Sequence, residues 1–348
     1  MNVCAFKDAE NLTELALTEY MTSIPRSAFQ NCISLTSLTI PKNIADIGAS
    51  AFRSCVSLAG ELKLGAKLQN VSQYAFDGCS ALTSLTVENP KCSFGTGCFS
   101  NCASLASIPN NLSRYALRMF ENCTSLTAIE LTDSVSSLAG YVFNGCSSVA
   151  HITLANPDMT FSEGFDFSSC PLITTAGPIG GGYDLEFAFT EKIPTRAFRC
   201  GEGSGESSLV SITLPGTIKE IGDQSFGGLT SLNSIELPES LDSIGDNAFR
   251  VCSSLTSISI PLSVTKIDIG AFFACTGLRD VYIYTPSVLS EYKVNDTSKM
   301  WFQGTGSYTT LHIPESLSDD DGTKAAIAYG QYWNYRTDTW TLTFYCDL

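Results

Sequence analysis

The chain has 348 residues, of which 44% are hydrophobic and 16% are charged, and its 35 acidic residues outnumber 20 basic ones to give a net charge of −15. Disordered acidic chains are poor in hydrophobic residues, so this composition indicates a folded protein. It also argues against nucleic-acid binding, which needs clustered Lys and Arg. No run of eighteen apolar residues is present, so we predict no membrane span.

The N-terminal residues already belong to a repeating pattern. Residues 1–30 contain no basic start followed by an apolar stretch, and therefore no signal peptide. Phe6, Leu12, Leu15 and Leu17 occupy positions of the repeat, so the chain begins inside a coil without the polar cap that the end of a solenoid needs. We therefore expect further sequence upstream, with an export signal.

A repeat of about 23 residues organises the chain as far as residue 284. Its marker is a phenylalanine that usually follows a small or apolar residue and precedes a cysteine by three positions. The spacings between successive markers are 21 to 24 residues, with two exceptions of 31 and 28 residues. A period of this length is the signature of a solenoid. The twelve markers are Phe6, Phe29, Phe52, Phe76, Phe99, Phe120, Phe143, Phe167, Phe198, Phe226, Phe249 and Phe272.

Each repeat predicts one coil with two short strands and a turn. The alternation of Leu38 and Ile40 predicts a strand with one buried face, which Pro41 ends because proline has no N–H to donate. Ile44 and Ile47 predict a second short strand before the turn at Gly48. The Ala-Phe-x-x-Cys segment is too short for an α-helix and predicts a helical or 3₁₀ turn. A single coil cannot bury its own apolar face, so stability must come from stacking on neighbours.

The repeat resembles a known family. The segment Cys252–Ile267, with Leu255, Ile258, Ile260 and Pro261 at the repeat positions, is similar to the BspA-like (treponemal-type) leucine-rich repeats. The resemblance covers about residues 4–284. It implies a right-handed, mainly β leucine-rich-repeat solenoid with a curved parallel sheet on its concave face. It also implies a bacterial cell-surface or secreted protein that acts in adhesion and protein binding.

Two insertions interrupt the array, near residues 176–187 and 201–207. Insertions in solenoids become loops on one face, often the binding face. The alternative is a tolerated surface insertion, because lengthening a loop costs little free energy. The Gly180–Gly182 run lacks the Lys and Ser/Thr that a phosphate-binding loop needs.

The tail at residues 285–348 differs in composition from the array of about twelve repeats at residues 1–284. All three tryptophans lie there, with many tyrosines. Large aromatic side chains can seal the exposed core of an end coil, so we predict a capping region. The alternative is an aromatic platform that binds glycans or peptides.

The fourteen cysteines predict a column of reduced, inert thiols. Side chains stacked in a column point the same way rather than at each other, which disfavours disulfides. A local bridge between Cys92 and Cys98, which lie off the main pattern, stays a hypothesis. No Cys-x-x-Cys pair exists, and His151 and His312 lie far apart, so we predict no metal site and no cofactor.

Outward positions of the main sheet are rich in Ser and Thr and turn aromatic near residue 284. This composition fits β-propensity and hydroxyl ladders, and it also fits a groove that binds an extended polypeptide or glycan. The candidate partner-binding residues are Glu130, His151, Tyr183, Glu236, Tyr282, Tyr284, Trp301 and Trp333.

We therefore expect a non-enzymatic module that binds a protein partner, such as an extracellular-matrix or cell-surface protein, at the cell surface or outside the cell. One alternative is a structural spacer that displays other domains. Another is glycan binding through the C-terminal aromatic residues. We expect neither nucleic acid nor a membrane span among its contacts.

Overall fold

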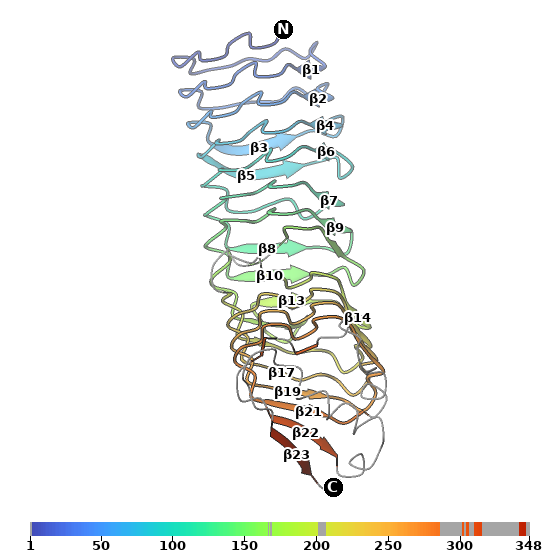
Figure 1. Ribbon diagram of the computed structural model, residues 1–348. Coiled ribbons are helices and arrows are strands. Elements are labelled where there is room, and N and C mark those ends of the chain that lie inside the picture. The colour runs from blue at the N-terminus through green and yellow to red at the C-terminus, as the bar shows by residue number, and fades with distance from the viewer. Residues whose placement is uncertain are drawn as a thin grey trace. The chain divides into compact units, whose positions relative to one another are not determined.

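The computed structural model describes residues 2–165, 167, 169–200, 207–285, 301–302, 304–305, 310–314 and 341–345. The chain forms two compact units, Met1–Ile173 (unit 1) and Thr174–Leu348 (unit 2). Within each unit, successive coils stack on one another and pair their strands in parallel (Figure 1). The predicted parallel β-solenoid of leucine-rich repeats is thus confirmed.

Unit 1 contains two sets of strands. The main sheet positions hold the longer strands, and the strands that come next in each coil have two residues each. The main strands are β3 (Gly60–Leu64), β5 (Leu82–Val87), β8 (Ala128–Leu131) and β10 (His151–Leu154). The short strands are β1 (Ser23–Ile24), β2 (Asp46–Ile47), β4 (Asn70–Val71), β6 (Ser93–Phe94), β7 (Arg114–Tyr115), β9 (Ser137–Leu138) and β11 (Thr160–Phe161).

The strand predicted around Leu38 and Ile40 does not form. Both side chains are half-buried, whereas Leu62 and Leu64 of the next coil are fully buried on β3. Leu15 and Leu17, in the coil before Leu38 and Ile40, are themselves only half-buried. The first coils therefore have less packing to hold a continuous ladder.

Unit 2 repeats this arrangement. Its main strands belong to two sheets: β13, β12, β15 and β17 are neighbours in that order in one, and β19, β21, β22 and β23 follow one another in the other. The main strands are β12 (Thr175–Pro178), β13 (Leu185–Phe187), β15 (Ser211–Ile212), β17 (Ser234–Ile235), β19 (Ser257–Ile260), β21 (Asp280–Ile283), β22 (Thr310–Pro314) and β23 (Thr341–Tyr345). The short strands are β14 (Lys192–Ile193), β16 (Glu220–Ile221), β18 (Ser243–Ile244) and β20 (Lys266–Ile267).

The turn around each phenylalanine forms a third hydrogen-bonded ladder. Phe29 N–H donates to the Ala51 carbonyl of the next coil (2.8 Å), and Asn31 N–H donates to the Arg53 carbonyl (2.8 Å). The predicted helical turn does not develop into a helix anywhere in the described part of the chain. Residues two before and two after the phenylalanine have left-handed backbone, as Ser50 (φ 56°) and Ser54 (φ 59°) do around Phe52. Positive φ at both positions prevents the run of right-handed residues that a helix needs.

Stacked phenylalanine rings fill the centre of both units. In unit 1 the ring centroids from Phe6 to Phe143 lie 5.2–6.3 Å apart. In the next coil the buried ring is Phe165, whereas the predicted Phe167 is half-buried. In unit 2 the rings from Phe198 to Phe272 stack at 5.0–5.5 Å.

The repeat continues beyond residue 284. Phe302 stacks on Phe272 with centroids 5.0 Å apart, and β22 and β23 extend the sheet from β21. Trp301 takes the small-residue position of this coil, since Phe272 N–H donates to its carbonyl just as Phe29 N–H donates to Ala51. The described part of the tail is therefore built as further rungs of the same stack.

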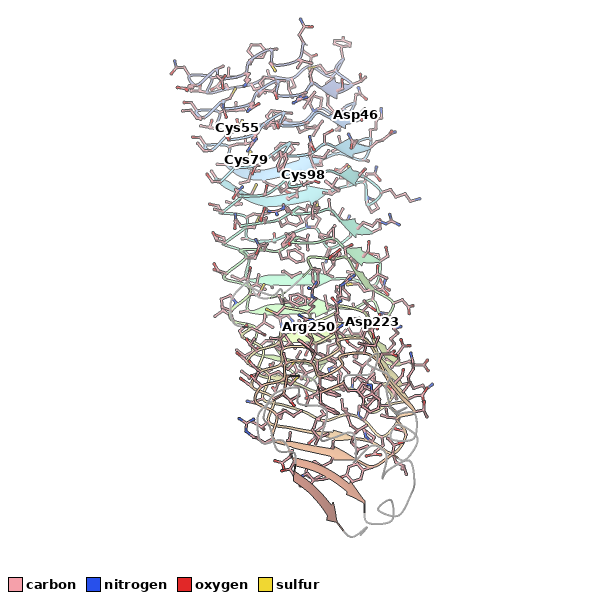
Figure 2. The ribbon with its side chains drawn as sticks, in the orientation of Figure 1. Asp46, Cys55, Cys79, Cys98, Asp223 and Arg250 are labelled. Atoms are coloured by element: carbon pink, nitrogen blue, oxygen red, sulfur yellow. The ribbon has the colours of Figure 1, made fainter. Side chains whose placement is uncertain are left out.

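The cysteines also form a column, as Cys55 and Cys79 show in Figure 2. Thiols of this column donate to the carbonyl of the phenylalanine one coil earlier, for example Cys55 Sγ to Phe29 O (3.2 Å) and Cys275 Sγ to Phe249 O (3.1 Å). The side chain thus adds a hydrogen bond between coils while it fills apolar space. No disulfide joins the thirteen cysteines that the structure describes, so Cys92 and Cys98 are not bridged in it. Cys346 lies outside the described residues.

Candidate partner-binding surface

The outward side of the main sheet in unit 2 carries an aromatic and charged cluster at β21 and β22. The parallel register places Tyr282 opposite His312, and the two rings stack with centroids 4.2 Å apart and planes 10° apart. His312 Nε2 lies 2.8 Å from Asp280 Oδ1, on the strand that carries Tyr282. Tyr284, the next outward residue, is 38% exposed. We call Asp280, Tyr282, Tyr284 and His312 the tyrosine cluster.

The alternation of the strand explains why these side chains gather. Val281 and Ile283 are fully buried in the core, so their neighbours on β21 must face outward. Glu236 is exposed directly after β17, two coils before Tyr282. The structure thus brings the predicted residues Tyr282 and Tyr284 together. Asp280 on β21 and His312 on β22 also belong to this cluster. They meet because the two strands pair in parallel register.

Unit 1 has a smaller polar pair on its main sheet. Glu130 and Thr153 are register partners on β8 and β10. His151 Nε2 lies 3.6 Å from Glu130 Oε1 and 3.2 Å from Thr153 Oγ1. The predicted residues Glu130 and His151 therefore meet each other, but they belong to a different unit from the tyrosine cluster.

The predicted residue Trp301 is buried. Trp301 is only 1% exposed, and its indole N–H donates to the carbonyl of Ile267 (2.8 Å). At the equivalent positions, Ile221 and Ile244 accept backbone N–H groups from the next coil. Trp301 thus completes the end of the short-strand sheet, and the prediction that it binds a partner is wrong. Trp333 lies outside the described residues.

Tyr183 is half-buried and packs within the insertion that contains it. A Cβ added at Gly177 would lie 2.2 Å from the Tyr183 ring, so the ring lies directly over that glycine. The insertion is not merely a surface loop, because its residues 185–187 form β13 in register with β12. Residues 201–206 of the second insertion lie outside the described residues.

Two carboxylates hold the first insertion in place. Asp184 accepts hydrogen bonds from the backbone N–H groups of Thr174 and Thr175 and from the Thr174 hydroxyl. Burial by itself would raise the pKa of Asp184, but these hydrogen bonds together lower it below its ordinary value. Glu186 accepts from the N–H groups of Gly180 and Gly182.

The buried thiols are chemically quiet at neutral pH. Burial raises the pKa of Cys55 and of Cys146 to about 12 and that of Cys92 to about 11. Burial likewise raises the pKa of Cys79, which is fully enclosed, well above its ordinary value. Because the thiolate is the reactive form, the column acts as structure.

Neither a metal centre nor a membrane helix is found in the described part of the chain. No group of three His, Cys, Asp or Glu side chains converges there in a way that could hold a metal ion. None of the segments described there is a helix with the length and hydrophobicity needed to cross a bilayer.

The parallel rungs, the central phenylalanine stack and the repeat period together define a leucine-rich-repeat protein. The family model described as the BspA type leucine rich repeat region matches residues 1–113, 69–179 and 191–321. The chain therefore belongs to the BspA-type leucine-rich-repeat family.

The fold is also similar to that of a solved structure. A leucine-rich repeat protein from Bacteroides ovatus is similar with a TM-score of 0.53 and 19% identity, over 95% of this chain and 91% of that one. A leucine rich cell surface protein from Faecalibacterium prausnitzii has a TM-score of 0.46 and 22% identity, over 91% of this chain and 89% of that one. The pneumococcal vaccine antigen PcpA has a TM-score of 0.43 and 16% identity, over 89% and 79% of the two chains. No curated protein matches the sequence.

Proposed function

We propose that the chain is a non-enzymatic, protein-binding module of a cell-surface or secreted protein, and that adhesion to proteins of a host or of neighbouring cells is its use. Membership of the BspA-type family supports the general role in protein interaction. The observation that carries the proposal is the tyrosine cluster, in which aromatic side chains lie outward on rigid parallel strands.

The cluster has the chemistry of an interface centre. Tyrosine offers a large apolar ring and a hydroxyl at little entropic cost, and it is enriched where proteins meet. Stacking on His312 and the contact from His312 to Asp280 hold the Tyr282 ring in one orientation before a partner arrives. Preorganisation of this kind lowers the entropy lost on binding. Ser257 and Ser259 of β19 continue the surface with small hydroxyl groups, over which an extended polypeptide can lie.

The test is a binding panel of matrix and cell-surface proteins against the whole chain. For a partner that binds, Tyr282→Ala should weaken the affinity at least about tenfold, as truncation of a central tyrosine does at other interfaces. Tyr141→Ala is the matched control, because Tyr141 is also an exposed tyrosine (41%) but lies in the turn ladder of unit 1. Binding by no member of the panel, or equal loss in both variants, would contradict the proposal.

A further inference from the structure

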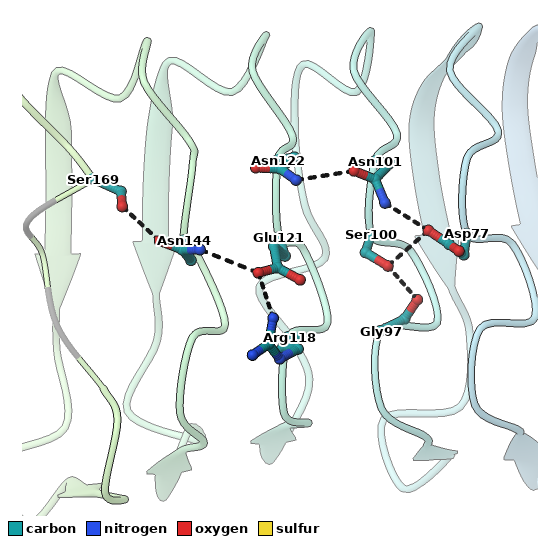
Figure 3. A network of polar contacts seen from close by, with 9 residues as sticks. All are labelled: Asp77, Gly97, Ser100, Asn101, Arg118, Glu121, Asn122, Asn144 and Ser169. Atoms are coloured by element: carbon teal, nitrogen blue, oxygen red, sulfur yellow. Dashed lines mark hydrogen bonds and ion pairs between the residues drawn. The ribbon is translucent and has the colours of Figure 1, made fainter. Parts of the chain in front are cut away.

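Polar side chains in the turns around the phenylalanines of unit 1 are joined to one another (Figure 3). Asp77, which is almost fully buried, receives Arg53 Nε from the preceding coil (2.9 Å) and Asn101 Nδ2 from the following coil (2.7 Å). Arg118 Nη1 lies 2.8 Å from Glu121 Oε1. These four charged side chains therefore have their partners inside the unit.

The turns that link the main strands to the short strands, which we call the corner turns, differ in this respect. Each is closed by a backbone hydrogen bond, as Leu68 N–H donates to the Gly65 carbonyl (3.1 Å). All charged residues of the corner turns in unit 1 are exposed, and among the residues that the structure describes none forms an ion pair with them. They are Glu19, Lys42, Lys67, Lys91, Asp133 and Asp158.

Backbone hydrogen bonds align the corner turns with one another. Just after the turns, Gln69 N–H donates to the Ala45 carbonyl (2.8 Å) and Ser93 N–H donates to the Gln69 carbonyl (2.8 Å). Further along, Thr160 N–H donates to the Ser136 carbonyl (3.1 Å). The residues two positions before these rungs therefore form one column over seven successive coils. They are Tyr20, Asn43, Lys67, Lys91, Asn111, Ser134 and Asp158.

The sign of the charge changes along this column. Lys67 and Lys91 lie in two successive coils, and the next coil has the neutral Asn111. Of the two coils that follow, the first has Asp133 beside its column residue and the second has Asp158 in the column. We call these five residues the charged corner. Its positive half and its negative half lie at equal distances from Asn111, so it is complementary to itself when reversed.

The polar contacts around the charged corner leave its lysines without a negative neighbour. Lys67 Nζ donates to Asn43 Oδ1 (2.8 Å), which is a neutral amide. Glu88 lies just before one of the corner turns, and its Oε2 accepts the backbone N–H of Ala66 (3.0 Å) rather than pairing with a lysine. The charge of the lysines is therefore compensated only by solvent ions or by a carboxylate from another molecule.

A two-fold axis at the coil of Asn111 brings the charged corners of two copies together in antiparallel order. Successive coils are spaced by about 4.8 Å, as paired strands are. Lys67, two coils before the axis, then faces Asp158 of the second copy, two coils after it. Lys91 faces the coil of Asp133 in the same way. Because a two-fold contact contains each pair twice, four ion pairs form.

We propose that the charged corner binds a second copy of this chain in an antiparallel, two-fold contact centred on Asn111. Exposed ion pairs are individually weak, so the dimer should have a Kd of about 1 mM at physiological salt. Charges more than about 8 Å apart are largely screened there, which limits the repulsion between two chains of net charge −15.

A contact of this strength matters where many copies are held close together, because tethering gives effective concentrations in the millimolar range. The surface of a cell provides that condition. This use of the contact rests on the proposed function, whereas the contact itself can be measured in solution.

The direct test is a zero-length crosslink in an equal mixture of ¹⁴N-labelled and ¹⁵N-labelled whole chains at about 1 mM, with a reductant present. A carbodiimide joins an ammonium group and a carboxylate that touch, and it takes up the water that amide formation releases. Mass spectrometry should find Lys67 joined to Asp158 in peptides that carry both isotopes. Within one chain the two residues are four coils apart, roughly 19 Å, which a zero-length link does not span. Absence of the mixed-isotope product would overturn the proposal.

Charge exchange gives the second test, with sedimentation equilibrium as the measurement. Lys67→Asp and Asp158→Lys should each weaken self-association at least about tenfold, because each places like charges opposite one another. The variant with both changes should associate as the unsubstituted chain does, because the pair forms again with reversed sign. A double variant as weak as the single ones would contradict the two-fold contact.

Lys63→Asp is the matched control for these variants. Lys63 is an exposed lysine of unit 1 that lies on β3, outside the charged corner, and its Nζ already contacts Glu61 Oε2 (3.2 Å). Self-association should be unchanged in this variant. All the substituted side chains are exposed, so thermal unfolding should stay the same throughout the series and show that the fold is kept.

A further arm tests a different occupant. If the chain stays monomeric while a sulfated hexasaccharide binds and depends on Lys67 and Lys91, the lysines belong to a polyanion site and the second copy is ruled out. The outcome is independent of the tyrosine cluster: Tyr282→Ala should leave self-association unchanged even if the binding panel finds no partner.

Discussion

The turn ladders of the two units have the same backbone and opposite chemistry. In unit 1 the rung at Asp77 is closed by Arg53, Ser100 and Asn101. In unit 2 the corresponding rung has Gly227, which has no side chain, between Arg199 and Arg250. The comparison teaches that the repeat specifies the stack through its apolar positions. The residues at the outward positions of the turns are free to differ from one coil to the next.

The largest expected effect is common to both units and concerns alkaline pH. Burial raises the pKa of the thiols along the column, to about 12 for Cys55 and Cys146, while an unfolded cysteine titrates near about 8.5. The protonated thiols therefore contribute stability that is fully present below about pH 8.5 and is lost as the pH rises toward 12. At pH 10 the thiols of Cys55 and Cys146 should each lower the free energy of unfolding by about 2 kcal/mol.

Both units should therefore lose stability on alkaline titration. Burial raises the pKa of Cys79, Cys102 and Cys123 in unit 1 and that of Cys252 in unit 2. Alkylation followed by mass spectrometry should show these thiols becoming reactive together as the coils open, between about pH 9 and 11. Reaction of Cys252 while Cys79 stays protected would show that the two units open separately.

Removal of one ring from the central stack should cost the two units the same free energy. Phe76 and Phe226 are both fully buried between neighbouring rings. Phe76→Ala and Phe226→Ala should each lower the free energy of unfolding by about 3–5 kcal/mol. Denaturant titration measures the loss. A loss below about 1 kcal/mol in one unit would mean that its core can rearrange to fill the space.

Removing the Asp77 carboxylate should have the next largest effect. Asp77→Gly removes a carboxylate that receives three donors and creates the arrangement found at Gly227. We expect a loss of about 3 kcal/mol, because charge-assisted hydrogen bonds are broken and a more flexible residue is introduced. Ser100→Ala, which removes only one of the donors, is the control and should cost about 1 kcal/mol. Near-equal stabilities of Asp77→Gly and the unsubstituted chain would show that the network contributes little.

The smallest effect should come from adding a carboxylate at Gly227. Gly227→Asp should raise the free energy of unfolding by no more than about 1 kcal/mol, since the new ion pairs involve arginines that solvent partly reaches. The gain should disappear in Gly227→Asn, which has the same shape without the charge. A destabilised Gly227→Asp variant would indicate that the space beside Gly227 cannot hold a carboxylate.

Several features could be predicted from the residues alone. The period of the phenylalanines and cysteines predicts a stack of coils, because equivalent apolar side chains can all be buried only in register. The alternation on β19 and β21 predicts which side chains face outward, and Tyr282 and Tyr284 do. The inert thiols follow from the same argument, since a column of buried side chains is shielded from solvent.

Other features depend on neighbours that meet only after folding. The turn around each phenylalanine is left-handed at Ser50 and Ser54, where no glycine signals it. The sequence places Trp301 in a predicted capping region and also among the candidate partner-binding residues, and it is buried because it takes the small-residue position of a further coil.

By itself, the sequence determines that the chain is a stack of repeating coils, because a period of about 23 residues leaves its apolar side chains no other common core. Only the tertiary structure decides which polar side chains of different coils meet. Arg199, Gly227 and Arg250 are separated by 28 and 23 residues in the sequence. They line one cavity because stacking places their coils next to one another, at the spacing that inter-coil hydrogen bonds set.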